Sequence, residues 1–183
     1  MSRIAPVSAP YSDALRRCFD RVVPAGMEPP RIYRVVARNE SLFVDLVERG
    51  LLGLTGLFDR GVLAPRLREI LILRTCAAAG NDYEWHLHVD SGLSPSMGLD
   101  AAEITDTRAH NPDPQLWAPS ELAAMKLSDA LVRRLAVDHV LFTQLREHFD
   151  EPTLIEMTQL IGWYTIVAMQ VALLDLRPIE GNL

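Results

Sequence analysis

The residues best suited to chemistry lie in the segment NDYEWHLH, residues 81–88. Glu84 and His88 are four positions apart, so their side chains lie on one face if the segment is helical. A histidine flanked by a carboxylate keeps a defined tautomer and can deliver or remove a proton near neutral pH. The segment therefore indicates a proton-transfer site.

A third acid occurs in the apolar stretch LREILILRTCAAA, which comes just before this segment. Glu69 is the residue there that packing explains least, because a buried carboxyl must be paired or protonated. Gly80, the residue that follows this stretch, favours a helix end. Asn81 favours a new helix start, with Glu84 completing a capping box. Along such an antiparallel pair the heights of Glu69 and His88 differ by roughly one helical turn. Glu69, Glu84 and His88 can thus converge on one cleft.

Each of these side chains also has a structural interpretation. Glu84 can serve only as the capping partner of Asn81, and His88 can be a core histidine with satisfied hydrogen bonds. Arg74 can bind a substrate carboxylate through its fork of donors, although a solvated or ion-paired arginine is more common. Cys76 is predicted to be an inert core thiol.

A metal site is not predicted. His86 and His88 diverge on a helix because they are two positions apart, whereas helical metal ligands are three or four apart. His86 and Asp90 have suitable spacing, but a surface pair is the preferred interpretation. Trp85 and Trp163 can line an apolar pocket, or by default pack in the core. We expect no metal and no cofactor.

The elements that position these residues are predicted to be helices. Apolar residues recur at three- and four-residue spacing, and glycine and proline separate the periodic segments. The predicted class is all-α, as one domain over residues 1–183, with an N-terminal extension of 1–30 and a core of about 31–175. Asn39 is the predicted N-cap of the third helix and Asp150 that of the last. The expected helices cover residues 10–23, 31–38, 40–60, 65–79, 82–92, 100–110, 120–135, 138–149 and 152–175.

Composition restricts the partners. The chain has 183 residues, 49% of them hydrophobic, and a formal net charge of −6 without a basic stripe, so no nucleic-acid partner is expected. Cys18 and Cys76 have no metal-like or redox-like spacing, which is typical of a cytoplasmic protein. The stretch 157–174 has no charged residue and the length of a membrane span. We predict a helix buried in a core or subunit interface, and no membrane partner.

The segment PRLREILILRTCAAAGNDYEWHLHV resembles the signature of the carboxymuconolactone decarboxylase family, which shares its fold with alkylhydroperoxidase D. In that signature a Glu is followed, twelve and fifteen residues later, by two characteristic positions and then by a His. In the peroxidase branch both of these positions are cysteines. Glu69, Asn81, Glu84 and His88 hold the four positions here at matching spacing. The Tyr-Glu-Trp before His88 is similar to the decarboxylase-like branch. The resemblance covers roughly residues 31–175, and the stretch between His88 and Gly98 is longer than usual in the family.

The resemblance implies a cofactor-free, decarboxylase-like enzyme that acts on a small carboxylated lactone or keto acid. It also implies a homo-oligomer, a trimer or hexamer. The candidate catalytic residues are His88, Glu84 and Glu69. The candidate substrate-binding residues are Arg74, Tyr83 and Trp85. Thiol peroxidase activity is disfavoured because the Cys-x-x-Cys pair is absent. The rival interpretation is a non-catalytic oligomeric binding or scaffold protein with the same fold.

Overall fold

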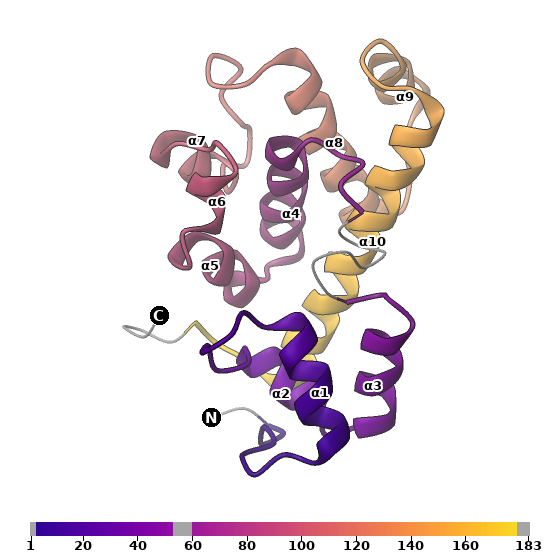
Figure 1. Ribbon diagram of the computed structural model, residues 1–183. Coiled ribbons are helices and arrows are strands. Elements are labelled where there is room, and N and C mark those ends of the chain that lie inside the picture. Colours follow the sequence, from indigo (N-terminus) through magenta and orange to yellow (C-terminus); the bar gives the residue numbers. More distant parts are fainter. Residues whose placement is uncertain (1–2, 53–59, 179–183) are drawn as a thin grey trace. The chain divides into compact units, whose positions relative to one another are not determined.

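The computed structural model describes residues 3–52 and 60–178, and within these residues it contains ten helices and no strand (Figure 1). The all-α class predicted from the sequence is confirmed. The helices are α1 (Asp13–Val22), α2 (Arg31–Val36), α3 (Glu40–Glu48), α4 (Pro65–Ala79), α5 (Asp82–Asp90), α6 (Leu93–Ser96), α7 (Ala101–Asp106), α8 (Pro119–Arg134), α9 (His139–Arg146) and α10 (Glu151–Leu174).

The chain divides into two compact units. The first comprises residues 1–61 and 174–176, and the second comprises residues 62–173 and 177–183. The boundary expected at residue 30 lies inside the first unit, and the single domain stays a prediction. All the candidate site residues belong to the second unit.

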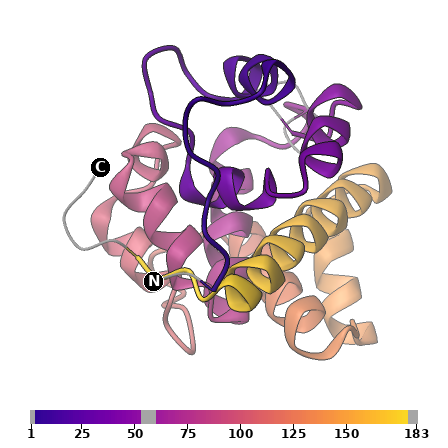
Figure 2. The same cartoon turned by 90° about the horizontal axis from the view of Figure 1, so that it is seen from below.

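The first unit has its own small core. Leu15 and Phe19 of α1 pack with Phe43 of α3, and the ring centroids of Phe19 and Phe43 are 5.1 Å apart. Leu174, the last residue of α10, belongs to this unit, and the backbone N–H of Arg3 donates to its carbonyl at 2.9 Å (Figure 2). This hydrogen bond joins the two chain segments that form the first unit.

Helix α3 is shorter than predicted. Asn39 caps it as expected, because its side-chain oxygen accepts from the backbone N–H of Leu42 at 3.3 Å. The helix ends at Glu48 instead of near residue 60, because Gly50 has φ +70°, outside the right-handed helical region. Residues 53–59 of the expected helix lie outside the described residues.

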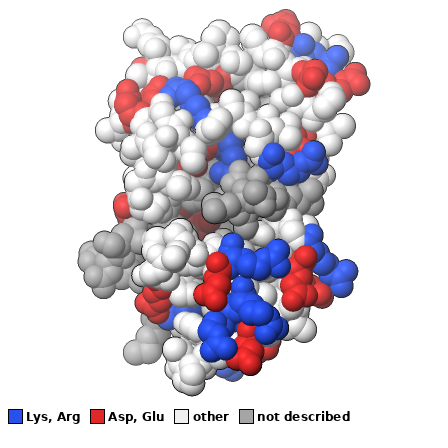
Figure 3. Space-filling model, in the orientation of Figure 1, with Lys and Arg blue, Asp and Glu red and all other residues white. Residues whose placement is uncertain are grey.

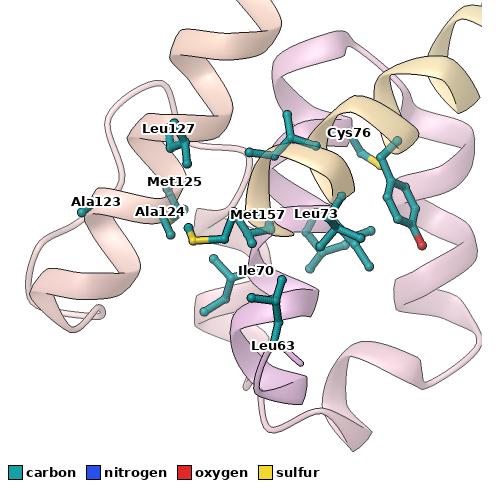
Figure 4. Close-up of a cluster of buried hydrophobic side chains, with 14 of the residues drawn as sticks. Leu63, Ile70, Leu73, Cys76, Ala123, Ala124, Met125, Leu127 and Met157 are labelled. Carbon is teal, nitrogen blue, oxygen red and sulfur yellow. The ribbon is translucent and has the colours of Figure 1, made fainter. Parts of the chain in front are cut away.

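Helix α4 is the central element of the second unit. Its residues from Glu69 to Cys76 are all buried, which follows from a sequence that is apolar on nearly every face. Helix α8 packs along α4, and Figure 4 shows side chains of α4, α8 and α10 meeting in one cluster. The two charged residues in the buried part of α4, Glu69 and Arg74, must therefore find partners inside the unit.

Two loop regions of the second unit differ from the prediction. The short helix α6 begins after Gly92, at φ +75°, in a stretch expected to be a loop. Helix α7 ends at Asp106 instead of near residue 110. The carboxylate of Asp106 accepts from the backbone N–H of Asp113 at 3.0 Å and from Nε1 of Trp117 at 2.7 Å, which folds the following loop back onto the helix end.

Helix α10 combines a buried face with an exposed one. It begins after Asp150, whose carboxylate accepts from the backbone N–H of Thr153 at 2.9 Å, as predicted. Met157 and Ile161 pack into the core of the second unit. Among the described residues, α10 is the helix long and apolar enough to cross a membrane, with a mean hydropathy of 1.4 over a window that is 39% buried. One such helix is weak evidence for a membrane span, because core helices of soluble proteins meet the same criterion.

Charged side chains of both signs are interspersed on the face shown in Figure 3. In the first unit, Arg16 pairs with Asp13 at 2.5 Å and Arg49 pairs with Asp45 at 3.2 Å. Exposed pairs of this kind contribute little to stability because water already solvates both charges.

Candidate active site

The turn between α4 and α5 brings three candidate residues together. Gly80 ends α4 in the left-handed region, with φ 67° and ψ 28°, as predicted. Asn81 starts α5, and its side-chain oxygen accepts from the backbone N–H of Glu84 at 3.2 Å. Because the connection consists of Gly80 and Asn81 alone, it fixes how Glu69 on α4 meets His88 on α5.

Glu69 and His88 form the buried pair that the helix spacing predicts. Nδ1 of His88 lies 3.0 Å from Oε1 and 3.1 Å from Oε2 of Glu69. Ser94 on α6 donates to Oε1 of Glu69 at 2.6 Å. An ionised carboxylate can only accept hydrogen bonds, so the Nδ1 atom of His88 carries the proton. In the neutral imidazole, Nε2 is then the nitrogen that can take a proton.

The Nε2 atom of His88 faces two oxygens. The hydroxyl of Tyr164 on α10 lies 3.4 Å from it, and Oε1 of Glu84 lies 3.8 Å from it. Both distances exceed those of a well-formed hydrogen bond. The rings of His88 and Tyr164 meet edge to face, with centroids 5.7 Å apart. Nε2 is therefore close to two polar groups and bound strongly to neither.

The burial of these residues is graded. Glu69 and Ser94 have no exposed surface, whereas His88 is 7% exposed and Glu84 and Tyr164 are each 8% exposed. The residues around Nε2 are thus slightly less buried than those around Nδ1.

The two carboxyls respond to burial in opposite ways. Burial raises the pKa of Glu69, but the hydrogen bond and charge of His88, together with the hydrogen bond from Ser94, outweigh burial and lower that pKa overall. Burial raises the pKa of Glu84, the charge of His88 opposes this only in part, and Glu69 adds to it. Oε2 of Glu84 is buried without a hydrogen-bond partner among the described residues, which explains why burial dominates there.

The prediction that Glu84 completes a capping box with Asn81 is wrong. In a capping box the Glu84 side chain would accept from the backbone N–H of Asn81. That N–H instead donates to the carbonyl of Cys76 at 2.8 Å, as part of the turn that ends α4. The Glu84 carboxyl is left to face His88.

Cys76 lies near the same carboxyls but is unsuited to nucleophilic chemistry. It is fully buried, and burial together with the charges of Glu84 and Glu69 raises its pKa well above the ordinary value. The thiolate is the reactive form of cysteine, and this environment disfavours it. These observations support the inert core thiol predicted from the sequence.

Arg74 is held by partners of its own. It is buried, donates to Oδ2 of Asp129 at 2.5 Å, and donates to the carbonyls of Thr107 and Ala109 at 2.9 Å and 2.7 Å. The guanidinium therefore joins α4 to α8 and to the loop after α7. Arg74 is thus ion-paired with Asp129, and substrate binding by Arg74 stays a prediction.

The two aromatic candidates lie on α5. Trp85 is buried, its Nε1 donates to Oγ1 of Thr107 at 3.1 Å, and the guanidinium of Arg108 lies 4.7 Å from the centre of its ring. Tyr83 is also buried. The contacts of Trp85 are those of a core side chain, and substrate contact by Tyr83 or Trp85 stays a prediction.

His86 lies outside the cluster. Its Nδ1 is 3.4 Å from Oδ2 of Asp90, and both side chains are partly exposed. This is the surface pair expected from their spacing. Within residues 3–52 and 60–178, no group of three or more His, Cys, Asp or Glu side chains has an arrangement that could hold a metal ion.

Two members of the cluster, Ser94 and Tyr164, were not predicted from the sequence. Ser94 lies in the stretch that is longer than usual in the family, where no helix was expected. Tyr164 is 76 residues from its partner His88, so no local spacing connects the two. The available signals were weak: an unexplained extra segment beside the site, and a tyrosine on a charge-free helix.

The second unit thus contains a buried carboxylate–histidine pair on the consecutive helices α4 and α5, with a second carboxyl from α5 and a tyrosine from α10 at the opposite ring nitrogen. This defines a class of helical proteins whose site is built on a helix hairpin. Residues 48–130 match the model of the carboxymuconolactone decarboxylase family. The matched stretch contains Glu69, Glu84 and His88, so the resemblance predicted from the sequence is confirmed over these residues.

Two solved structures share the fold over nearly the whole chain. A cysteine-to-alanine variant of the debrominase Bmp8 in complex with 2,3,4-tribromopyrrole has a TM-score of 0.78 and 16% identity, covering 98% of this chain and 93% of that one. The debrominase Bmp8 in its apo form has a TM-score of 0.76 and 15% identity, covering 97% and 92%. Identities this low show the fold alone, and they confirm the alkylhydroperoxidase D-like helical architecture. No curated protein matches the sequence.

Proposed function

We propose that this protein is a cofactor-free enzyme that transfers a proton at carbon, in a decarboxylase-like reaction on a small carboxylated lactone or keto acid. The observation that carries the proposal is the orientation of His88, with Nδ1 fixed by Glu69 and Nε2 held near Glu84 and Tyr164. The family match and the similarity to a debrominase with a bound bromopyrrole support an enzymatic role on small molecules.

The chemistry follows from the two ends of the imidazole. Breaking the bond between carbon and a carboxylate releases CO2 and leaves an electron pair, which a neighbouring carbonyl takes up as an enolate. The Nε2–H of protonated His88 then donates its proton to carbon, the carbonyl re-forms, and solvent returns a proton to His88. Glu69 keeps the ring oriented and stabilises the protonated imidazolium throughout.

Glu84 makes the site compatible with an anionic substrate. A second full negative charge beside Glu69 would repel a carboxylate. Because burial raises the pKa of Glu84, its neutral form is favoured. A neutral carboxyl is a hydrogen-bond donor, so Glu84 can contact a substrate oxygen close to Nε2.

Peroxidase chemistry does not fit the residues at the hairpin. It needs two thiols three positions apart, one of them activated. Asn81 and Glu84 hold those positions, and neither can form a disulfide. The remaining thiol of the second unit, Cys76, is fully buried with a raised pKa.

The test is absorbance-monitored turnover of gamma-carboxymuconolactone by metal-free protein, followed by a panel of other carboxylated lactones and β-keto acids. We expect His88→Gln to lose roughly 10²–10⁴-fold in turnover, the usual contribution of a general acid. His86→Gln is the matched control, because it removes a partly exposed imidazole from the same helix and should retain activity within about threefold.

A non-catalytic binding or scaffold role is the alternative that this experiment separates. The complete burial of Glu69 favours it, since a sealed ion pair can hold two helices together without doing chemistry. Failure of the unmodified protein to act on any member of the panel would support that alternative. Equal turnover by the unmodified protein and His88→Gln would remove His88 from the mechanism.

A further inference from the structure

Asn81 and Glu84 each contain a buried polar atom without a partner. Nδ2 of Asn81 and Oε2 of Glu84 make no hydrogen bond among the described residues. Leaving a buried polar group in this state is costly, so a native fold that does so calls for an explanation. Because the two residues are three positions apart at the start of α5, their side chains are neighbours on one face of the helix.

The orientation of the Asn81 amide is fixed by its capping role. The backbone N–H of Glu84 needs an oxygen as its acceptor, and it lies 3.2 Å from Oδ1 of Asn81. The other end of the amide is therefore Nδ2, which is a donor with two N–H groups. The cap holds this side chain in place and uses only its oxygen, so the donor end is positioned without being used.

The two unpartnered atoms lie close beneath the surface of the second unit. Asn81 and Glu84 keep 3% and 8% of their surface exposed, whereas Thr75, whose buried hydroxyl is also unpartnered, has none. An atom of a partly exposed residue lies within a side chain's length of solvent. Changes of side-chain rotamer, which are common on binding, are enough to let a small ligand reach such an atom.

The same two residues lead to the reactive nitrogen of His88. The second oxygen of the Glu84 carboxyl, Oε1, lies 3.8 Å from Nε2 of His88. A ligand group held at Oε2 therefore has its next atoms within reach of Nε2. Asn81 extends this face by one turn to the start of α5, where the helix dipole favours a negative charge.

A carboxylate is the ligand group that matches these atoms. It has two acceptor oxygens and no donor, and Nδ2 of Asn81 is a donor only. The raised pKa of Glu84 favours its protonated form, which donates as well. Arg74, the carboxylate-binding candidate of the sequence, does not compete for this task, because its guanidinium donates to Asp129 at 2.5 Å.

We propose that Asn81 and Glu84 form a carboxylate-binding site on α5, in which Nδ2 of Asn81 and the carboxyl of Glu84 donate hydrogen bonds to the carboxylate of a small substrate beside Nε2 of His88. This inference rests on the proposed function for its reaction. It deepens that function by assigning the residues that select a carboxylate over its neutral ester. Asn81 is a substrate-binding residue here, and no bond to it forms or breaks.

The experiment measures binding of γ-butyrolactone-γ-carboxylate and of its neutral methyl ester to the full-length protein by isothermal titration. The variants are Asn81→Asp and Asn81→Ser. Aspartate and serine both cap helices well, so each variant keeps the capping oxygen and loses the amide donor. Asn39→Asp is the matched control, because Asn39 caps α3 of the first unit through the same contact, to the backbone N–H of Leu42 at 3.3 Å.

We expect the unmodified protein to bind the carboxylate at least about tenfold more tightly than the ester, which is the effect of one hydrogen bond to a charged group. Asn81→Ser should weaken carboxylate binding about tenfold. Asn81→Asp should abolish the preference for the carboxylate, because it places a second carboxylate against the ligand. Asn39→Asp should keep the preference within about threefold. If Asn81 only caps α5, all four proteins will show the same ratio of affinities.

The kinetic counterpart separates binding from chemistry. Where turnover of a carboxylated lactone is measurable, Asn81→Ser should raise KM about tenfold and leave kcat within about threefold, because Asn81 holds a part of the substrate away from the proton transfer. A fall in kcat without a change in KM would overturn the binding role of Asn81.

The two proposals fail separately. A carboxylate preference that depends on Asn81, without turnover of any substrate, would retain the binding site and overturn the decarboxylase. Turnover that depends on His88, with the same carboxylate preference in both Asn81 variants as in the unmodified protein, would retain the enzyme and overturn the binding site. Equal affinity of the unmodified protein for the carboxylate and the ester, or binding of neither, would also overturn the site.

Discussion

Glu69 and Glu84 are two buried carboxyls beside one histidine, yet their pKa values shift in opposite directions. The difference lies in their partners. Glu69 is contacted by His88 and Ser94 through its Oε1 atom, whereas Oε2 of Glu84 has no hydrogen-bond partner among the described residues. Pairs of titratable groups separated in this way are a common means of assigning acid and base roles in one site. Here the lowered pKa suits Glu69 to the ionised form, and the raised pKa suits Glu84 to the protonated form.

Substitution Glu84→Gln tests the neutral role of Glu84. Its folded-state pKa is raised, so stability falls as pH rises from the unfolded-state pKa through the folded-state pKa. Glutamine cannot ionise, so Glu84→Gln should be more stable than the unmodified protein at pH 7 and should lack this decline. Turnover should be retained within about tenfold, because the glutamine amide still offers a hydrogen-bond donor to the substrate oxygen. Urea unfolding at pH 5 and pH 8, beside a kinetic assay, measures both; a loss of stability at pH 8 would contradict the assignment.

Substitution Ser94→Ala tests the support of Glu69. It removes a buried hydrogen bond to a charged oxygen, and we expect a loss of about 1.5–3 kcal/mol at pH 7. The lowered pKa of Glu69 gives stability that is present above the unfolded-state pKa and lost as pH falls through the folded-state pKa. Without Ser94 that folded-state pKa rises, so the acid-induced loss should begin at a higher pH. Ser96→Ala, at an exposed hydroxyl of the same helix that donates to the backbone, should change stability by less than about 0.5 kcal/mol.

At the scale of elements, the turn between α4 and α5 determines the site. Gly80 has φ +67°, and a Cβ added there would meet nothing within 4 Å. Gly80→Ala should therefore destabilise the protein by about 1–2 kcal/mol through backbone strain alone. Gly80→Asn should have a smaller effect, because asparagine tolerates the left-handed region better. Equal midpoints for Gly80→Ala and the unmodified protein in urea unfolding would contradict this account of the turn.

The same turn shows what the sequence could predict. Glycine and asparagine at the helix boundary, with fixed spacing on either side, place Glu69, Glu84 and His88 together, because helix geometry converts spacing into direction. Tyr164 could not be found in this way, since α10 meets α5 through tertiary packing. The capping-box prediction for Glu84 was wrong because the N–H of Asn81 has two possible acceptors, the Glu84 side chain and a carbonyl at the end of α4. It donates to the carbonyl of Cys76.

At the scale of the whole molecule, the exposed face of α10 concerns the predicted homo-oligomer. Ile155, Ile166, Met169 and Leu173 are exposed, and with Gln159 and Gly162 they follow an alternating spacing of four and three residues. That spacing keeps side chains on one stripe of a helix and is typical of a seam that packs on a second helix. The stripe carries no charge, so a second copy of the same chain can pack on it without burying an unpaired charge.

We therefore predict a mass of at least two chains by size-exclusion chromatography with light scattering. Met169→Glu should shift the protein toward the monomer, because it places a charge in the stripe, where burial without a partner is costly. Val140→Glu on α9 is the matched control: Val140 is 68% exposed and Met169 is 65% exposed, but Val140 lies outside the stripe. Val140→Glu should leave the mass unchanged. A monomer for the unmodified protein at micromolar concentration would remove the oligomer, and loss of assembly in both variants would place the interface elsewhere than on α10.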